Sequence, residues 1–158
     1  MKLWNPMLLL AVMLFAAGLP SWAQVDKVAA RTKGISCGDC ALIAEIYLRR
    51  LPGVDKVMIS RSQEAVLVLY KPGTRFQPWD IRDALARTDV TVVQFQIGAR
   101  GRLQEAGGKS FFVAGNDKFL LVSSPKIPSD SPVSIEGIVN DRTDPMELKV
   151  LTLKQLKP

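Results

Sequence analysis

Two cysteines, Cys37 and Cys40, lie three positions apart in a chain of 158 residues that contains no histidine. Any soft-metal or thiol chemistry must therefore use this single dithiol. The pair follows a predicted strand and opens a predicted apolar helix, where backbone N–H groups and the helix dipole favour thiolates. This position predicts a reactive Cys-x-x-Cys site.

Two thiolates in a turn from loop to helix can bring both sulfurs onto one ion. Soft thiolates select soft metals of low coordination number such as Cu(I) over hard ones. Structural zinc normally takes four Cys or His ligands, so zinc is less expected, because it would need carboxylates or a second molecule. Two ligands also leave room for a metal-bridged dimer. Asp39, between the cysteines, could attract a cation but also opposes thiolate formation, and as a solvated residue of the first helical turn it needs no further role.

Two other interpretations of the same cysteines remain open. The first is a thiol-disulfide redox protein, although thioredoxin-like proteins usually place a strand and a helix before the active-site strand. The second is a non-enzymatic envelope interaction module with an incidental disulfide. Absence of histidine removes Ser-His and Cys-His nucleophile pairs and the usual general base. We therefore expect a binding protein and no enzyme.

Residues 1–23 are typical of an export signal. Lys2 is followed by an apolar core over residues 7–17, and Ser21 and Ala23 fit a small-x-small cleavage rule. The apolar core is shorter than the roughly 20 residues that span a bilayer, so we expect cleavage after Ala23 and no stable membrane insertion. The expected location is periplasmic or secreted, an oxidising compartment in which the cysteines can form a disulfide.

The net charge of +6 is spread along the chain with no run of five or more like charges. Such scattered charges are typical of a solvated surface. No nucleic-acid partner is expected.

Residues 24–98 have the pattern of one small α+β domain. Strands are expected at residues 25–33, 54–60, 64–70 and 90–97, and helices at residues 41–51 and from Pro78 onward. This order predicts a ferredoxin-like βαββαβ sandwich with both helices on one face of an antiparallel sheet. In the first helix Leu42, Ile43, Ile46 and Tyr47 recur at helical spacing. The expected core residues are Val28, Ile43, Ile46, Val57, Ile59, Val66, Val68, Ile81, Leu85 and Val93.

The cysteine segment Gly34-Ile-Ser-Cys-Gly-Asp-Cys40, with Leu51-Pro-Gly-Val54 and Val57-Met-Ile-Ser60 after the helix, resembles the heavy-metal-associated domain family. With an export signal in front, the type resembled is the periplasmic mercury-binding protein, whose fold the copper chaperones share. The resemblance covers residues 25–98. It implies Cu(I) or Hg(II) as the bound ion, Cys37 and Cys40 as its ligands, and a metal-transfer protein as a partner.

Two loop residues and one segment after the second helix bear on that resemblance. Gly34 would allow the loop a tight path, and Ile35, where the family usually has methionine, would pin the loop to the core. At the end of the second helix the chain reads Arg87-Thr-Asp-Val90, where the family often has a Gly-Tyr or Gly-Phe pair beside the metal. The outer face of the site is therefore undefined by the motif.

Residues 99–158 change in composition, with glycines between short apolar runs. Strands at residues 103–106, 109–114, 118–123, 133–140 and 146–153 predict a small all-β barrel joined by a short link at residues 98–101. The pattern resembles OB-fold-like barrels of exported bacterial proteins. Phe111, Phe112 and Phe119 could form a stacking platform, although core packing explains them better. The barrel could dock a partner or simply stabilise the first domain.

The residues and the resemblance together predict an exported soft-metal-ion-binding protein, a carrier or scavenger that uses Cys37 and Cys40.

Overall fold

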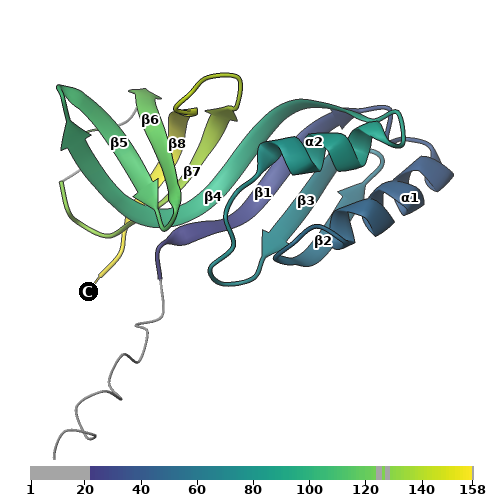
Figure 1. Cartoon of the computed structure of the whole chain (residues 1–158), viewed down its shortest axis with the longest axis horizontal. Coiled ribbons are helices and arrows are strands. Elements are labelled where there is room, and N and C mark those ends of the chain that lie inside the picture. The colour runs from purple at the N-terminus through teal and green to yellow at the C-terminus, as the bar shows by residue number, and fades with distance from the viewer. Residues whose placement is uncertain (1–21, 124–125, 127–128, 158) are drawn as a thin grey trace, which may run out of the picture.

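The computed structural model describes residues 22–123, 126 and 129–157, so residues 1–21 of the predicted export signal lie outside the described part. Over the described residues, none of the helices has the length and apolar character needed to cross a membrane. The predicted α+β class and the order of elements are confirmed (Figure 1). The elements are β1 (Gln24–Lys33), α1 (Gly38–Arg49), β2 (Val54–Ser60), β3 (Ala65–Tyr70), α2 (Pro78–Ala86), β4 (Thr91–Ala106), β5 (Lys109–Ala114), β6 (Asp117–Ser123), β7 (Val133–Asn140) and β8 (Glu147–Gln155).

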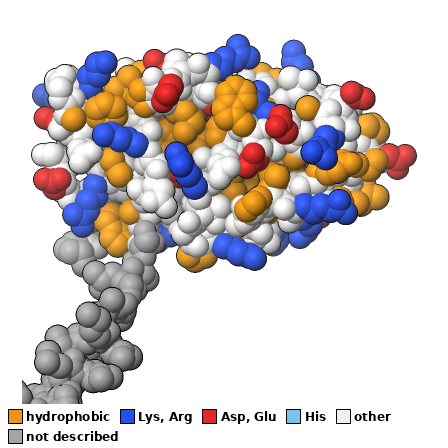
Figure 2. Space-filling view, viewed as in Figure 1, with side chains coloured by type: hydrophobic (Ala, Val, Ile, Leu, Met, Phe, Trp, Pro, Cys, Tyr) orange, Lys and Arg blue, Asp and Glu red, His pale blue; other side chains and the backbone are white. Residues whose placement is uncertain are grey.

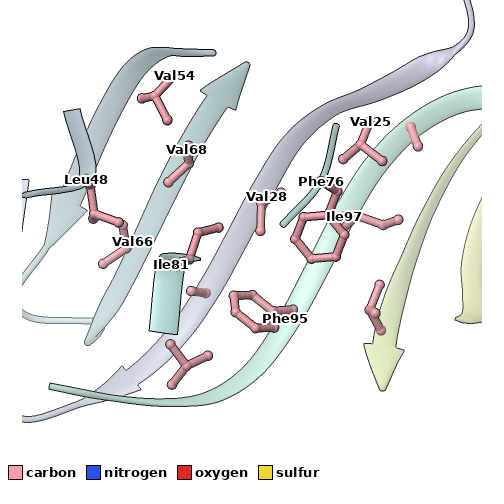
Figure 3. Close-up of a cluster of buried hydrophobic side chains, with 14 of the residues drawn as sticks. Val25, Val28, Leu48, Val54, Val66, Val68, Phe76, Ile81, Phe95 and Ile97 are labelled. Atoms are coloured by element: carbon pink, nitrogen blue, oxygen red, sulfur yellow. The ribbon is translucent and has the colours of Figure 1, made fainter. Parts of the chain in front are cut away.

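The first half of the chain is an antiparallel sheet in the order β2-β3-β1-β4 with two helices packed against it (Figure 1). Side chains of α1, α2 and all four strands β1, β2, β3 and β4 form a common core, in which Leu48, Val66, Val68 and Ile81 point toward one another (Figure 3). This arrangement brings the β1–α1 loop, the β2–β3 hairpin and the start of β4 to the same end of the sheet.

The predicted buried face of α1 is wrong. Ile43 and Ile46, expected in the core, are 44% and 42% exposed, and Leu42 is 60% exposed. The helix instead turns Ala41, Ala44 and Leu48 inward. These three positions satisfy the helical period equally well, and two small alanines let the helix lie close to the sheet. Hydrophobic side chains consequently reach the surface over α1 (Figure 2).

Val93 is a second exception to the predicted core. Its side chain is 42% exposed, whereas Val92 and Phe95 are buried. The pairing of β1 with β4 shifts register here, since Arg31 lies opposite Gln94 and Thr32 opposite Val92. Val93 is therefore the extra residue of a β-bulge, which breaks the alternation of inward and outward side chains. Ile59 is partly buried, and the other predicted core residues are buried: Val28, Val57, Val66, Val68, Ile81 and Leu85.

The expected link at residues 98–101 is part of a strand. β4 runs unbroken from Thr91 to Ala106 and continues from the first half into the second (Figure 1). Over residues 95–100 it pairs with β1 on one side and β7 on the other, and beyond them with β5. The predicted boundary between residues 98 and 99 therefore falls inside a strand that both halves share.

Five strands close a barrel in the second half, as predicted. β4, β5, β6, β8 and β7 follow one another, and the pairing of β7 with β4 completes the circle. β6 and β8 are parallel, and every other neighbouring pair is antiparallel. Phe112 and Phe119 are fully buried, which confirms core packing as their role, and the half-buried Phe111 has Lys118 Nζ 4.4 Å above its ring.

Polar and aromatic contacts fasten the barrel to the first half. Phe76, which precedes α2, packs its ring against Phe95 of β4 and Phe119 of β6, with centroid distances of 5.8 Å and 6.3 Å. Arg82 of α2 donates two hydrogen bonds to the Asp141 carboxylate, at 2.6 Å and 2.8 Å. Burial alone would raise the pKa of Asp141, but the hydrogen bonds from Arg82 hold that pKa below its usual range. The two halves therefore share side-chain contacts as well as a strand.

Candidate metal centre

Cys37 caps the first turn of α1. Its backbone is extended, with φ −72° and ψ 135°, and its carbonyl oxygen accepts the Ala41 N–H at 3.0 Å. The Cys40 N–H donates to Cys37 Sγ at 3.1 Å. The sulfur thus takes the place of the oxygen that usually satisfies a free N–H group at a helix start. The helix N-terminus accordingly stabilises negative charge on Cys37 Sγ once the sulfur is reduced.

The two cysteines are joined to each other by a disulfide bond, with their Cα atoms 5.2 Å apart. Cys37 is exposed and Cys40 is half-buried, so the pair is open to solvent at the loop surface. The predicted site residues are therefore brought together, and in this structure they are oxidised. Binding of a metal through both sulfurs requires reduction by two electrons first.

Gly34 and Ile35 fix the path of the loop that leads to Cys37. Gly34 has φ +94°, and a Cβ built on it would lie 2.9 Å from the backbone oxygen of Asp89, which precedes β4. Ile35 is fully buried in the core. Gly34 therefore lets the loop pass close to the segment that follows α2, and the buried side chain of Ile35 anchors the loop to the core.

The β2–β3 hairpin holds the same loop from the other side, a contact that the sequence analysis missed. Arg61 Nε donates to the Ser36 carbonyl oxygen at 2.9 Å, and the Gly34 N–H donates to Glu64 Oε1 at 3.2 Å. The Glu64 carbonyl oxygen also accepts the N–H of Thr32, at 2.7 Å. The sequence gives only a topological indication of these contacts. In the predicted βαββαβ order, the hairpin between β2 and β3 lies at the same end of the sheet as the loop between β1 and α1.

The site offers two protein ligands within one chain. In the part of the chain that the structure describes, no group of three or more Cys, Asp or Glu side chains is placed to hold a metal ion. Asp39 is exposed in the first turn of α1. The arrangement suits an ion that is satisfied by two soft sulfur ligands.

No protein-family model and no curated protein matches this sequence. Among solved structures the chain is similar to a CopZ metallochaperone, at 24% identity and a TM-score of 0.39, covering 42% of this chain and 98% of that one. It is also similar to the yeast copper transporter domain Ccc2a, described in apo and Cu(I)-loaded states, at 23% identity and a TM-score of 0.37, covering 43% and 94%. A third structure, described by crosstalk between Cu(I) and Zn(II) homeostasis, has 26% identity and a TM-score of 0.36, covering 44% and 96%. These matches cover less than half of the chain, and the function proposed below rests on the chain's own residues.

Proposed function

We propose that this protein is an exported carrier or scavenger of a soft metal ion, with Cys37 and Cys40 as the ligands and without catalytic turnover. The observation that carries the proposal is the geometry of the two sulfurs, which are near enough to bond and lie at an exposed helix N-terminus. After reduction the same two atoms can both reach one ion. Cu(I) and Hg(II) are the proposed ions, and zinc is less favoured because it prefers four ligands.

The finer fold assignment belongs to the same proposal. The first half is a ferredoxin-like βαββαβ module of the heavy-metal-associated type, supported by the order β2-β3-β1-β4 and by the position of the cysteine loop. The second half is an OB-like barrel, supported by its five strands and their closure through β6 and β8. The barrel serves as a scaffold for the metal module and as a surface for an envelope partner.

Export is supported by residues 1–23 of the sequence and by the position of Gln24. This residue is the first of β1, so cleavage after Ala23 leaves every strand intact. Intact-mass spectrometry of the protein purified separately from the cytoplasm, the periplasm and the culture medium tests this point. A chain that begins at Gln24 supports the proposal, and a chain that retains Met1 in the cytoplasm contradicts it.

The proposed partners are the metal ion and a protein that receives it. A pair of two-ligand sites can also share one ion between two chains, which predicts a metal-bridged dimer at low ratios of metal to protein. Mass measurement by light scattering across a metal titration tests for this dimer. A monomer at every ratio contradicts it and leaves the single-chain site.

Affinity for the ion is the direct test of the carrier. The reduced mature protein is titrated with Cu(I) and Hg(II) in competition with a small thiol, beside the double variant Cys37→Ser, Cys40→Ser. We expect one ion per chain with submicromolar, cysteine-dependent affinity, because soft ions prefer paired thiolates. Equal affinity in the double variant contradicts the proposal.

A thiol-disulfide redox protein is the second candidate, and the disulfide between Cys37 and Cys40 favours it. An exposed disulfide at a helix N-terminus is open to attack by a partner thiolate, with Cys37 Sγ as the leaving or attacking sulfur. An insulin-reduction assay separates the two functions. Catalysed insulin reduction together with weak metal affinity would favour the redox function over the metal carrier.

A further inference from the structure

Arg61 places a permanent positive charge on the cysteine loop. Its Nε donates to the Ser36 carbonyl oxygen at 2.9 Å, which fixes the guanidinium against the residue before Cys37. A Cβ built on Gly38, the residue after Cys37, would lie 3.6 Å from Arg61 Nη1 and 3.7 Å from Cζ. The charged group therefore covers the loop on both sides of Cys37 in sequence. No ion pair in the described part of the chain neutralises it.

The hairpin that carries Arg61 is itself fixed to the loop. Glu64 has a left-handed backbone, with φ +47°, and is tied to the loop by its carboxylate and to β1 by its carbonyl oxygen. A non-glycine residue in this conformation costs about 1–3 kcal/mol and persists where its surroundings hold it. The guanidinium is therefore carried on a segment with a defined position rather than on a free loop.

The charge of the bound complex depends on the ion. Two thiolates around a monovalent ion such as Cu(I) leave a net charge of minus one, whereas two thiolates around a divalent ion such as Hg(II) leave none. A cation beside the site stabilises the first complex and has little net attraction for the second. Arg61 therefore acts on the difference between the two affinities, while the release of protons from the thiols is common to both ions.

Negative groups at the same end of the sheet act in the opposite direction. Asp39 lies in the first turn of α1, between the two cysteines, and the Glu64 carboxylate lies beside Gly34. Glu64 is held by the Gly34 N–H, and Asp39 is exposed to solvent. The guanidinium is the group that the structure fixes over Gly38, between the two cysteines in the chain.

We propose that Arg61 is a specificity-determining residue that favours a monovalent soft ion over a divalent one at the Cys37–Cys40 site. The inference rests on the proposed metal-binding function: relative to the same site without the charge, Arg61 shifts the ratio of the two affinities toward Cu(I). The same contact with Ser36 also positions the loop, so the test must separate charge from positioning.

The experiment measures the dissociation constants for Cu(I) and Hg(II) on the reduced full mature chain and compares their ratio between variants. Arg61→Gln removes the charge, Arg61→Lys keeps it, and Asp39→Asn removes an opposing charge. Arg50→Gln is the matched control, because Arg50 follows the far end of α1 and is also exposed. Circular dichroism and thermal melting confirm that each variant is folded.

Arg61→Gln should lower the preference for Cu(I) by about two- to fivefold at low salt, the range expected for an exposed charge pair. Arg61→Lys should restore most of it, Asp39→Asn should raise it, Arg50→Gln should leave it unchanged, and added salt should shrink the effect. An equal loss of affinity for both ions in Arg61→Gln, or an unchanged ratio, overturns the inference while the carrier function stands. A wild-type protein that binds neither ion overturns both.

Discussion

Gly34 is the residue at which the chain leaves β1 for the cysteine loop. Its φ of +94° lies in the left-handed region, and a Cβ would come within 2.9 Å of the Asp89 carbonyl oxygen. The first feature disfavours any L side chain by about 1–2 kcal/mol. The second requires backbone to move, because the atom contacted is a main-chain oxygen. The position of Cys37 therefore depends on the absence of a side chain three residues earlier.

We predict that Gly34→Ala lowers the free energy of unfolding by about 2–4 kcal/mol, the sum of a backbone penalty and a steric one. Gly73→Ala is the matched control, since Gly73 has φ +80° and nothing within 4 Å of its Cβ position. That variant should lose only about 1–2 kcal/mol. Urea denaturation of the oxidised proteins measures both. Equal losses would show that the contact with Asp89 does not constrain the loop.

The proximity of the two cysteines could be predicted from the sequence, whereas the contact of Arg61 with the cysteine loop could not. A Cys-x-x-Cys segment between a strand and a helix is local, and three positions leave the sulfurs few ways to lie apart. Arg61 meets Ser36 across a sequence separation of 25 residues. That contact depends on which way a hairpin side chain points, which no pattern in the sequence encodes.

Asp117 joins two elements that are far apart in sequence. It opens β6, and its Oδ2 accepts the backbone N–H of Phe76 before α2 at 2.9 Å. Its side chain is 2% exposed, and the Arg75 Nε lies 3.8 Å away. Burial raises the pKa of Asp117 to about 6, against the lowering by the Phe76 hydrogen bond and by Arg75. Near neutral pH this contact therefore contains a buried negative charge.

The stability contributed by Asp117 should fall as pH rises. Its folded-state pKa of about 6 lies above the ordinary value of 3.8, so the folded protein holds the proton more tightly. The contribution is complete below the ordinary value and is lost as pH rises through about 6. Asp117→Asn keeps an acceptor for Phe76 and removes the charge. Its free energy of unfolding relative to wild type should rise by about 1–3 kcal/mol between about pH 4 and about pH 7.

Chemical denaturation at several pH values measures this difference. Asp55→Asn, at an exposed position of β2, is the control and should give no comparable trend. A difference between Asp117→Asn and wild type that does not change with pH would contradict the cost assigned to the buried charge.

Helix α1 shows where element-level prediction reaches its limit. Its start beside the cysteines and its end before Pro52-Gly53 follow local rules, and both were predicted to within a few residues. Its orientation was not, because Leu42, Ile43 and Ile46 score as more hydrophobic than Ala41 and Ala44. Ala41 and Ala44 face the sheet because the distance between helix and sheet leaves room for small side chains at these positions. That distance is set by the packing of the whole core, so it cannot be read from the sequence of the helix.

The whole molecule is organised around β4. The strand completes the sheet of the first half, provides one wall of the barrel, and contributes Phe95 to the core shared with Phe76. The sequence pattern predicts two strands and a link in its place, because Gly98 and Gly101 interrupt the apolar run. Both glycines are buried inside β4. A Cβ on Gly101 would collide with the Val113 carbonyl oxygen, whereas a Cβ on Gly98 would meet only the flexible side chain of Lys27. Gly101 therefore marks a close approach between β4 and β5, and not a boundary between two domains.

A fragment of residues 24–98 should therefore melt at least about 10 °C below residues 24–158. It lacks β7, which pairs with β4, and it lacks Phe119 and Asp141, the partners of Phe76 and Arg82. Thermal melting followed by far-UV circular dichroism makes the comparison. Identical melting of the two chains would show that the barrel does not stabilise the first half and would leave partner docking as its role.

The ligand set of the bound ion is the most direct test of the proposed site. X-ray absorption spectroscopy on the reduced protein loaded with one equivalent of Cu(I) reports which atoms surround the metal. Two sulfur neighbours from Cys37 and Cys40, lost in the Cys37→Ser, Cys40→Ser variant, are the predicted result. A first coordination sphere made of oxygen or nitrogen, or one unchanged by the double substitution, would contradict a dithiol metal site.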